Sequence, residues 1–120
     1  MSAVAVDFDG VIHAYSRGWA DGTIYDEPVP GAFSALHSLM SSYAVFVHTT
    51  RNSAEVADWI TARSNIPCTV EVNPDAEFWN VRGELLVTNR KLPAVAYIDD
   101  RAIRFESWPQ ALNDLGELVS

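Results

Sequence analysis

The stretch Val4-Ala5-Val6-Asp7-Phe8-Asp9-Gly10 decides how this chain folds. A short apolar run that leads directly into acids and a glycine is typical of a buried strand of a parallel sheet followed by a turn. Residues 94–100, Ala-Val-Ala-Tyr-Ile-Asp-Asp, repeat this arrangement late in the chain. Ligands of open α/β sheets bind just beyond the carboxyl ends of the strands. We therefore expect both acidic pairs at the functional edge of the sheet.

The two acidic pairs predict a metal site. If their strands are neighbours, four carboxylates share one small mouth, and like charges that close destabilise one another unless a cation compensates. Oxygen-rich clusters of this kind suit Mg²⁺. The expected donors are Asp7, Asp9, Asp99 and Asp100.

Length and composition indicate one globular domain over residues 1–120. The chain has 120 residues, is 48% hydrophobic and contains one cysteine, Cys68, which excludes an intrachain disulfide. It has neither a basic segment followed by an apolar stretch nor an apolar run that could span a bilayer, so we expect a cytoplasmic protein without membrane association. The net charge of −8 argues against broad nucleic-acid binding, although a small phosphorylated substrate stays compatible with it.

Apolar runs and helical spacing alternate along the chain, which predicts a three-layer α/β domain with a mostly parallel sheet. Residues 13–30 show no clean period and are expected to form an ordered flap or short hairpin, while residues 75–82 fit either a helical turn or a loop. Strands are expected at 3–8, 44–48, 66–72, 85–88 and 94–98, and helices at 31–42, 53–64 and 107–118.

The order of the polar motifs resembles that of the haloacid dehalogenase (HAD) superfamily. The matching segments are DFDGVI at 7–12, VFVHTTR at 45–51, Lys91 within NRKLP, and YIDDRA at 97–102. Together they extend from residue 4 to residue 104, and the chain looks closest to small HAD-like proteins of phage and bacterial type. Lys91 is the only lysine of the chain. The resemblance implies a Rossmann-like fold and a Mg²⁺-dependent phosphomonoester hydrolase.

Phosphoryl transfer needs an in-line nucleophile, a proton source for the leaving oxygen and positive charge around the phosphoryl oxygens. The resemblance implies that Asp7 is the nucleophile, which forms an aspartyl-phosphate, and that Asp9 is the general acid and base. It further implies that Thr49 and Lys91 bind and stabilise the phosphoryl group. Substrate contacts are expected from Gly10, Thr49, Thr50, Arg51 and Lys91. The implied Mg²⁺ ligands are Asp7, the backbone carbonyl of Asp9, Asp100, and Asp99 either directly or through water.

The chain has no room for a separate cap domain, so the segment 13–30 can only be a flap. An open site of this kind admits nucleotides or the terminal phosphate of a nucleic acid, and a homo-oligomer could supply a missing wall. Tyr15, Trp19 and Tyr25 on the flap suit either stacking on a base or pinning the flap to its own domain. His13 and His48 are expected near the site at the carboxyl ends of the strands.

Other classes of protein share some of these residues. A phosphorylation-switched receiver domain has a similar size and also uses an aspartyl-phosphate, a Thr and a Lys, but it places them in a different order along the chain. A HAD-like metal-binding or sensor protein without turnover would have no need of Asp9 beside Asp7. A phosphotransferase would use the same residues as the hydrolase and stays open.

Overall fold

Strands and helices alternate along the computed structural model, which describes residues 3–70, 76–99, 103–104 and 107–119. The strands are β1 (Ala3–Asp7), β2 (Ala44–His48), β3 (Cys68–Val70), β4 (Leu85–Thr88), β5 (Ala96–Asp99) and β6 (Ile103–Arg104). The helices are α1 (Ala32–Met40), α2 (Ser53–Ser64) and α3 (Trp108–Val119).

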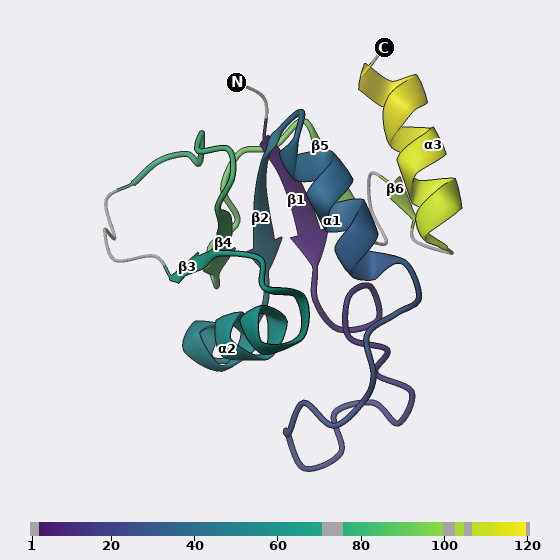
Figure 1. The fold of residues 1–120 in the computed structure, drawn as a ribbon, viewed down its shortest axis with the longest axis vertical. Coiled ribbons are helices and arrows are strands. Elements are labelled where there is room, and N and C mark those ends of the chain that lie inside the picture. The colour runs from purple at the N-terminus through teal and green to yellow at the C-terminus, as the bar shows by residue number, and fades with distance from the viewer. Residues whose placement is uncertain (1–2, 71–75, 100–102, 105–106, 120) are drawn as a thin grey trace.

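The strands form one sheet in the order β3-β4-β2-β1-β5-β6, and every neighbouring pair is parallel (Figure 1). All strand carboxyl ends therefore lie at the same edge. After β1 the chain builds β2, β3 and β4 on one side, and it later places β5 and β6 on the other side. This reversal beside β1 is the kind of switch point at which α/β proteins bind ligands.

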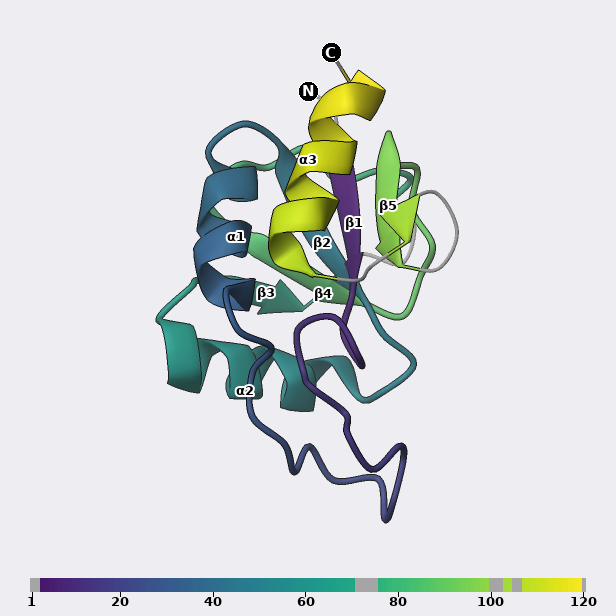
Figure 2. The ribbon, with the colours of Figure 1, turned by 90° about the vertical axis from the view of Figure 1, so that its right-hand side faces the viewer.

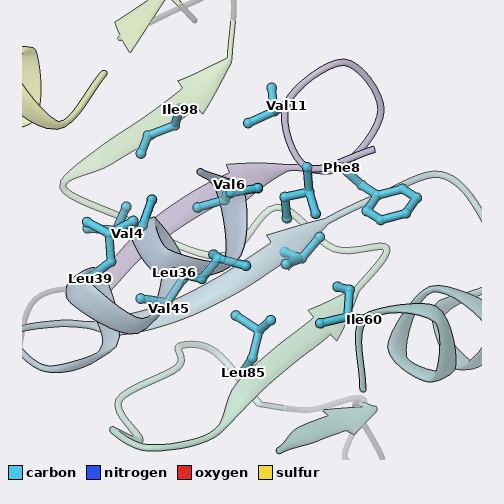
Figure 3. Packing of buried hydrophobic residues seen from close by; sticks show 14 of the residues in the cluster. Val4, Val6, Phe8, Val11, Leu36, Leu39, Val45, Ile60, Leu85 and Ile98 are labelled. Carbon is cyan, nitrogen blue, oxygen red and sulfur yellow. The ribbon is translucent and has the colours of Figure 1, made fainter. Parts of the chain in front are cut away.

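One face of the sheet packs against all three helices. Val4 and Val6 of β1, which point to the same side because strand side chains alternate, are fully buried in this cluster. Figure 3 shows them with Leu36 and Leu39 of α1. The cluster also contains residues of α2 and α3, so a single apolar core fixes the helices to the sheet.

The opposite face carries a smaller cluster and no described helix. Ala5 and Phe46 are fully buried there, and Leu92 and the half-buried Trp79 cover them from segments without regular structure. The expected third layer is thus supplied, within the described residues, by loops rather than helices. Residues 76–84 and 89–95 lead into and out of β4 and form no helix, so these connections cover the sheet as loops.

Local signals explain where the helices begin. Asn52 caps α2, because its side chain accepts a hydrogen bond from the backbone N–H of Glu55 at 3.1 Å. Ser107 plays the same part for α3, where its hydroxyl oxygen accepts from the N–H of Gln110 at 3.3 Å. All three helices were predicted from the sequence to within two residues at each end.

The flap between β1 and α1 projects beyond the carboxyl edge of the sheet (Figures 1 and 2). It has no regular strands, but single bridges join His13 to Asp9 and to Pro28. Tyr25 closes the loop on itself: its hydroxyl accepts from the N–H of Arg17 at 2.6 Å and donates to the carbonyl of Gly18 at 2.9 Å. The flap is therefore internally bonded, as an ordered loop requires.

None of the helices in the described part of the chain has the length and apolar character that a membrane crossing requires.

Candidate active site at the carboxyl edge of the sheet

The chain turns sharply after β1 around the carbonyl oxygen of Phe8. This oxygen accepts hydrogen bonds from the backbone N–H groups of residues 11–13 at 2.9–3.2 Å, and Gly10 adopts a φ of 83° within the turn. The left-handed conformation at this position favours glycine. Because the Phe8 side chain is fully buried, it anchors the turn and leaves Asp7 and Asp9 at the edge on either side of it.

The loop after β2 holds Thr49 against the end of β4. The N–H of Thr49 donates to the carbonyl of Thr88 at 3.0 Å, and the Asn89 side chain donates to the carbonyls of Thr49 and Arg51 at 2.7 and 2.8 Å. The Thr49 hydroxyl oxygen accepts from the N–H of Arg51 at 3.1 Å. A hydroxyl that accepts in this way keeps its own O–H as a donor, which suits an anionic ligand.

These loops surround a cavity of about 350 Å³. It brings together residues that are widely separated in the chain, and five of them were predicted from the sequence: Asp7, Asp9, Thr49, Thr50 and Lys91. Tyr15 and His48 complete the lining. The register of the sheet explains why these residues lie close together. Asp7 pairs with His48 of β2, and His48 pairs with Thr88 of β4, so the three strands end side by side.

The carboxyl group of Asp9 is held by two partners. The Nε of Arg51 lies 3.1 and 2.9 Å from its two oxygens, and Nδ1 of His13 lies 2.9 Å from Oδ1. Arg51 and His13 are both buried, whereas Asp9 retains 19% of its side-chain exposure. Asp9 thus presents an oriented carboxyl group to the cavity.

His13 connects Asp9 to the part of the flap that returns toward α1. Its Nε2 lies 3.0 Å from the backbone nitrogen of Asp26. Because an amide N–H can only donate, Nε2 accepts, and the proton of the neutral ring lies on Nδ1 and is donated to Asp9. Sequence reasoning placed His13 near the mouth but missed this role; the spacing of four residues between Asp9 and His13 was the available signal.

The aromatic residues of the flap divide into separate roles. Tyr15 adopts a φ of 61°, an uncommon conformation for a bulky residue, and reaches the wall of the cavity. Trp19 is half exposed and stacks on Arg51, whose guanidinium carbon lies 4.4 Å from its ring centre. Tyr25 closes the flap through its two hydrogen bonds within the loop, and its ring packs edge-on against His13.

Hydrogen bonds on the flap also perturb an acid. The pKa of Asp26 is lowered to about 2 from the usual 3.8, because hydrogen bonds stabilise its carboxylate. The Ser16 hydroxyl contributes most, and the backbone N–H groups of Ser16 and Glu27 contribute less. The bonds from Ser16 join the outgoing and returning segments of the flap next to the Asp26 amide, which donates to His13.

Several predicted site residues lie elsewhere. Gly10 and Arg51 do not line the cavity; Arg51 is turned toward Asp9, and its Nη2 has no partner among the residues that the structure describes. Direct contact of Arg51 with a substrate stays a prediction. The backbone of Asp99 ends β5, but its side chain and the whole of Asp100 lie outside the described residues.

The donor set for a metal can be judged in part. Among the described residues no three His, Cys, Asp or Glu side chains form a group that could hold an ion. However, Val6 pairs with Ile98, so Asp7 and Asp99 occupy the next positions on neighbouring strands. Carboxyl groups are ligands that a hard cation such as Mg²⁺ prefers, so the residue types at these two backbone positions fit such an ion.

Comparisons with family models, with curated proteins and with solved structures gave no match for this chain. The class of protein therefore has to be argued from the site itself.

Proposed function

We propose that this chain is a Mg²⁺-dependent phosphomonoester hydrolase of the haloacid dehalogenase type, which acts through an aspartyl-phosphate on Asp7. The observation that carries the proposal is the cavity that collects Asp7, Asp9, Thr49 and Lys91 from three separate stretches of the chain. A nucleophile, an acid, a hydroxyl donor and a cation are the parts that phosphoryl transfer requires.

In the first half of the reaction, a carboxylate oxygen of Asp7 attacks the phosphorus. The bond between phosphorus and the leaving oxygen breaks, and this oxygen takes the proton of the Asp9 carboxyl group to leave as an alcohol. Thr49 donates a hydrogen bond to a phosphoryl oxygen, and the ammonium group of Lys91 stabilises the charge on the transferred group.

In the second half, Asp9 acts as the base. Its carboxylate takes a proton from a water molecule, whose oxygen attacks the phosphorus, and the bond between phosphorus and Asp7 breaks to release phosphate. Arg51 and His13 contact the Asp9 carboxyl group and orient it at the cavity.

Mg²⁺ would be held by Asp7, the backbone carbonyl of Asp9, Asp99 and Asp100, and it would reduce the repulsion between the Asp7 carboxylate and the phosphate dianion. The adjacent positions of Asp7 and Asp99 on β1 and β5 support this set.

We propose a nucleotide, or a terminal phosphate of a nucleic acid, as the substrate. The cavity volume of about 350 Å³ lies within the range for small-ligand sites, so it can hold the phosphate group and part of the group attached to it. The leaving group would then extend toward the flap, where Tyr15 offers an aromatic ring.

Phosphate release from a panel of phosphomonoesters, weighted toward nucleotides, tests the proposal. We expect release with Mg²⁺, loss of release with a chelator, and no turnover by Asp7→Asn, which keeps the size of the side chain but not the nucleophile. Circular dichroism of the variant checks that it folds. Undiminished release by Asp7→Asn would contradict the assignment, and binding of Mg²⁺ without release from any ester would favour a binding or sensor role.

A further inference from the structure

One buried arginine joins Asp9 to the middle of the flap. The Nε of Arg51 binds both oxygens of Asp9 at 3.1 and 2.9 Å, and its Nη1 donates to the carbonyl oxygen of Gly22 at 2.7 Å. Asp9 lies 42 residues from Arg51 and Gly22 lies 29 residues from it, so this side chain ties together three distant parts of the chain.

The surroundings of Arg51 make this arrangement rigid. Its side chain is only 3% exposed, and charge-assisted hydrogen bonds that are shielded from water are stronger than those at the surface. Trp19 covers the guanidinium group, and Gly22 lies so close to this ring that an added Cβ would meet it at 3.3 Å. Gly22 also has a φ of 88°, so both space and backbone conformation favour glycine there.

A second connection runs in parallel with the first. His13 binds Asp9 through Nδ1 and accepts from the N–H of Asp26 through Nε2, at 2.9 and 3.0 Å. The carboxyl group of Asp9 is therefore attached to the flap at two points, Gly22 through Arg51 and Asp26 through His13. A movement of the flap between residues 14 and 27 must then reorient Asp9.

We propose that Arg51 is a positioning residue: it fixes the carboxyl group of Asp9 relative to the cavity by binding it to the flap. The chemical consequence rests on the proposed function of Asp9 as acid and base. Tyr15 of the same flap lines the cavity. The flap therefore contacts the leaving group and also holds Asp9, the acid that protonates this group. Arg51 thereby affects the proton transfers without touching the phosphoryl group.

Hydrogen exchange of the flap amides tests the connection itself, without reference to activity. The variants are Arg51→Gln, Asp9→Asn, which breaks the same pair from the other side and keeps the Arg51 side chain in place, and Arg82→Gln as a matched control. Arg82 is an exposed arginine that donates to the backbone carbonyl of Ser41, away from the cavity. We expect amides of residues 14–27 to exchange about tenfold faster in the first two variants and at the wild-type rate in the control. Unchanged flap exchange in both Arg51→Gln and Asp9→Asn would overturn the proposal.

Kinetics with two kinds of leaving group test the effect on proton transfer. An alkyl phosphate needs protonation of its leaving oxygen, whereas p-nitrophenyl phosphate hardly does. We expect Arg51→Gln to lower kcat/KM, which reports only the steps up to release of the leaving group, about 100-fold for the alkyl ester and less than about tenfold for the aryl ester. The double variant with Asp9→Asn should be no worse than Asp9→Asn alone. Equal losses for both esters, or additive losses in the double variant, would contradict a positioning role. If the wild-type protein hydrolyses neither ester, the two esters are replaced by those that the panel identifies as substrates, and hydrogen exchange by itself decides whether Arg51 holds Asp9 to the flap.

Discussion

The imidazole of His13 is fully buried and uses both of its ring nitrogens. It stacks on Phe8 at 5.5 Å between ring centres and meets Tyr25 and Trp59 edge-on at 5.3 and 5.7 Å. A neutral His with the proton on Nδ1 donates to Asp9 and accepts from the N–H of Asp26. The ring therefore stabilises the packing of the flap and also orients the Asp9 carboxyl group.

Replacement of His13 by alanine should therefore be strongly destabilising. It would leave a cavity and the half-buried N–H of Asp26 without its acceptor, and we expect the free energy of unfolding to fall by roughly 2–5 kcal/mol. Urea denaturation measures this loss. His37→Ala on the exposed side of α1 is the control and should stay within about 0.5 kcal/mol. A His13→Ala protein as stable as the control would show that the buried network is not formed in solution.

The Asp26 carboxyl group predicts a pH-dependent change confined to the flap. Its pKa is about 2 in the folded protein, below the usual 3.8, so its bonds to Ser16 stabilise the flap above about pH 4 and are lost as the pH falls toward 2. An NMR titration of Asp26 should give a midpoint near 2 in the wild type. Ser16→Ala, which removes only the hydroxyl, should raise this midpoint toward 3.8. A wild-type midpoint near 4 would contradict the bonding of the flap.

At the level of elements, periodic patterns and caps were sufficient to predict most of the structure. The strands at 44–48 and 85–88 were predicted with correct bounds, and the helix expected at 107–118 was found at Trp108–Val119. The two-residue strand β6 was not predicted, because it is too short to show a period. The three-layer arrangement was expected, but among the described residues loops form the layer on the second face, because half-buried loop residues such as Trp79 can cover a sheet without any repeat in the sequence.

The N-cap of α2 provides a test of this local reasoning. Asn52→Ala removes the side-chain oxygen that accepts from the N–H of Glu55, and we expect a loss of about 1 kcal/mol in urea denaturation. Asn113→Ala, an exposed site within α3, is the matched control and should be neutral or slightly stabilising, since alanine has the higher helix propensity. Equal effects of the two substitutions would argue against the cap.

At the level of the whole molecule, the parallel order of the strands explains why a site could be predicted from the sequence at all. Residues that end parallel strands meet at one edge whatever their separation in the chain, which is how the acids after β1 and at the end of β5 were expected together. Thr49 and Lys91 were added to this group because the order of the motifs resembles that of the haloacid dehalogenase superfamily, and both line the cavity with Asp7. The pair between Arg51 and Asp9 and the entry of Tyr15 into the cavity could not be predicted, because both depend on the path of an aperiodic flap.

The central claim is that this edge forms an aspartyl-phosphate on Asp7, and chemical trapping tests it most directly. The protein is mixed with a phosphomonoester that it hydrolyses and quenched during turnover. Borohydride, which reduces an acyl phosphate at aspartate to homoserine, is then added, and the peptides are mapped by mass spectrometry. We expect homoserine at position 7, and none in Asp7→Asn or when the chelator is present. Homoserine at another aspartate, or its absence at position 7 while wild-type protein releases phosphate, would contradict the account.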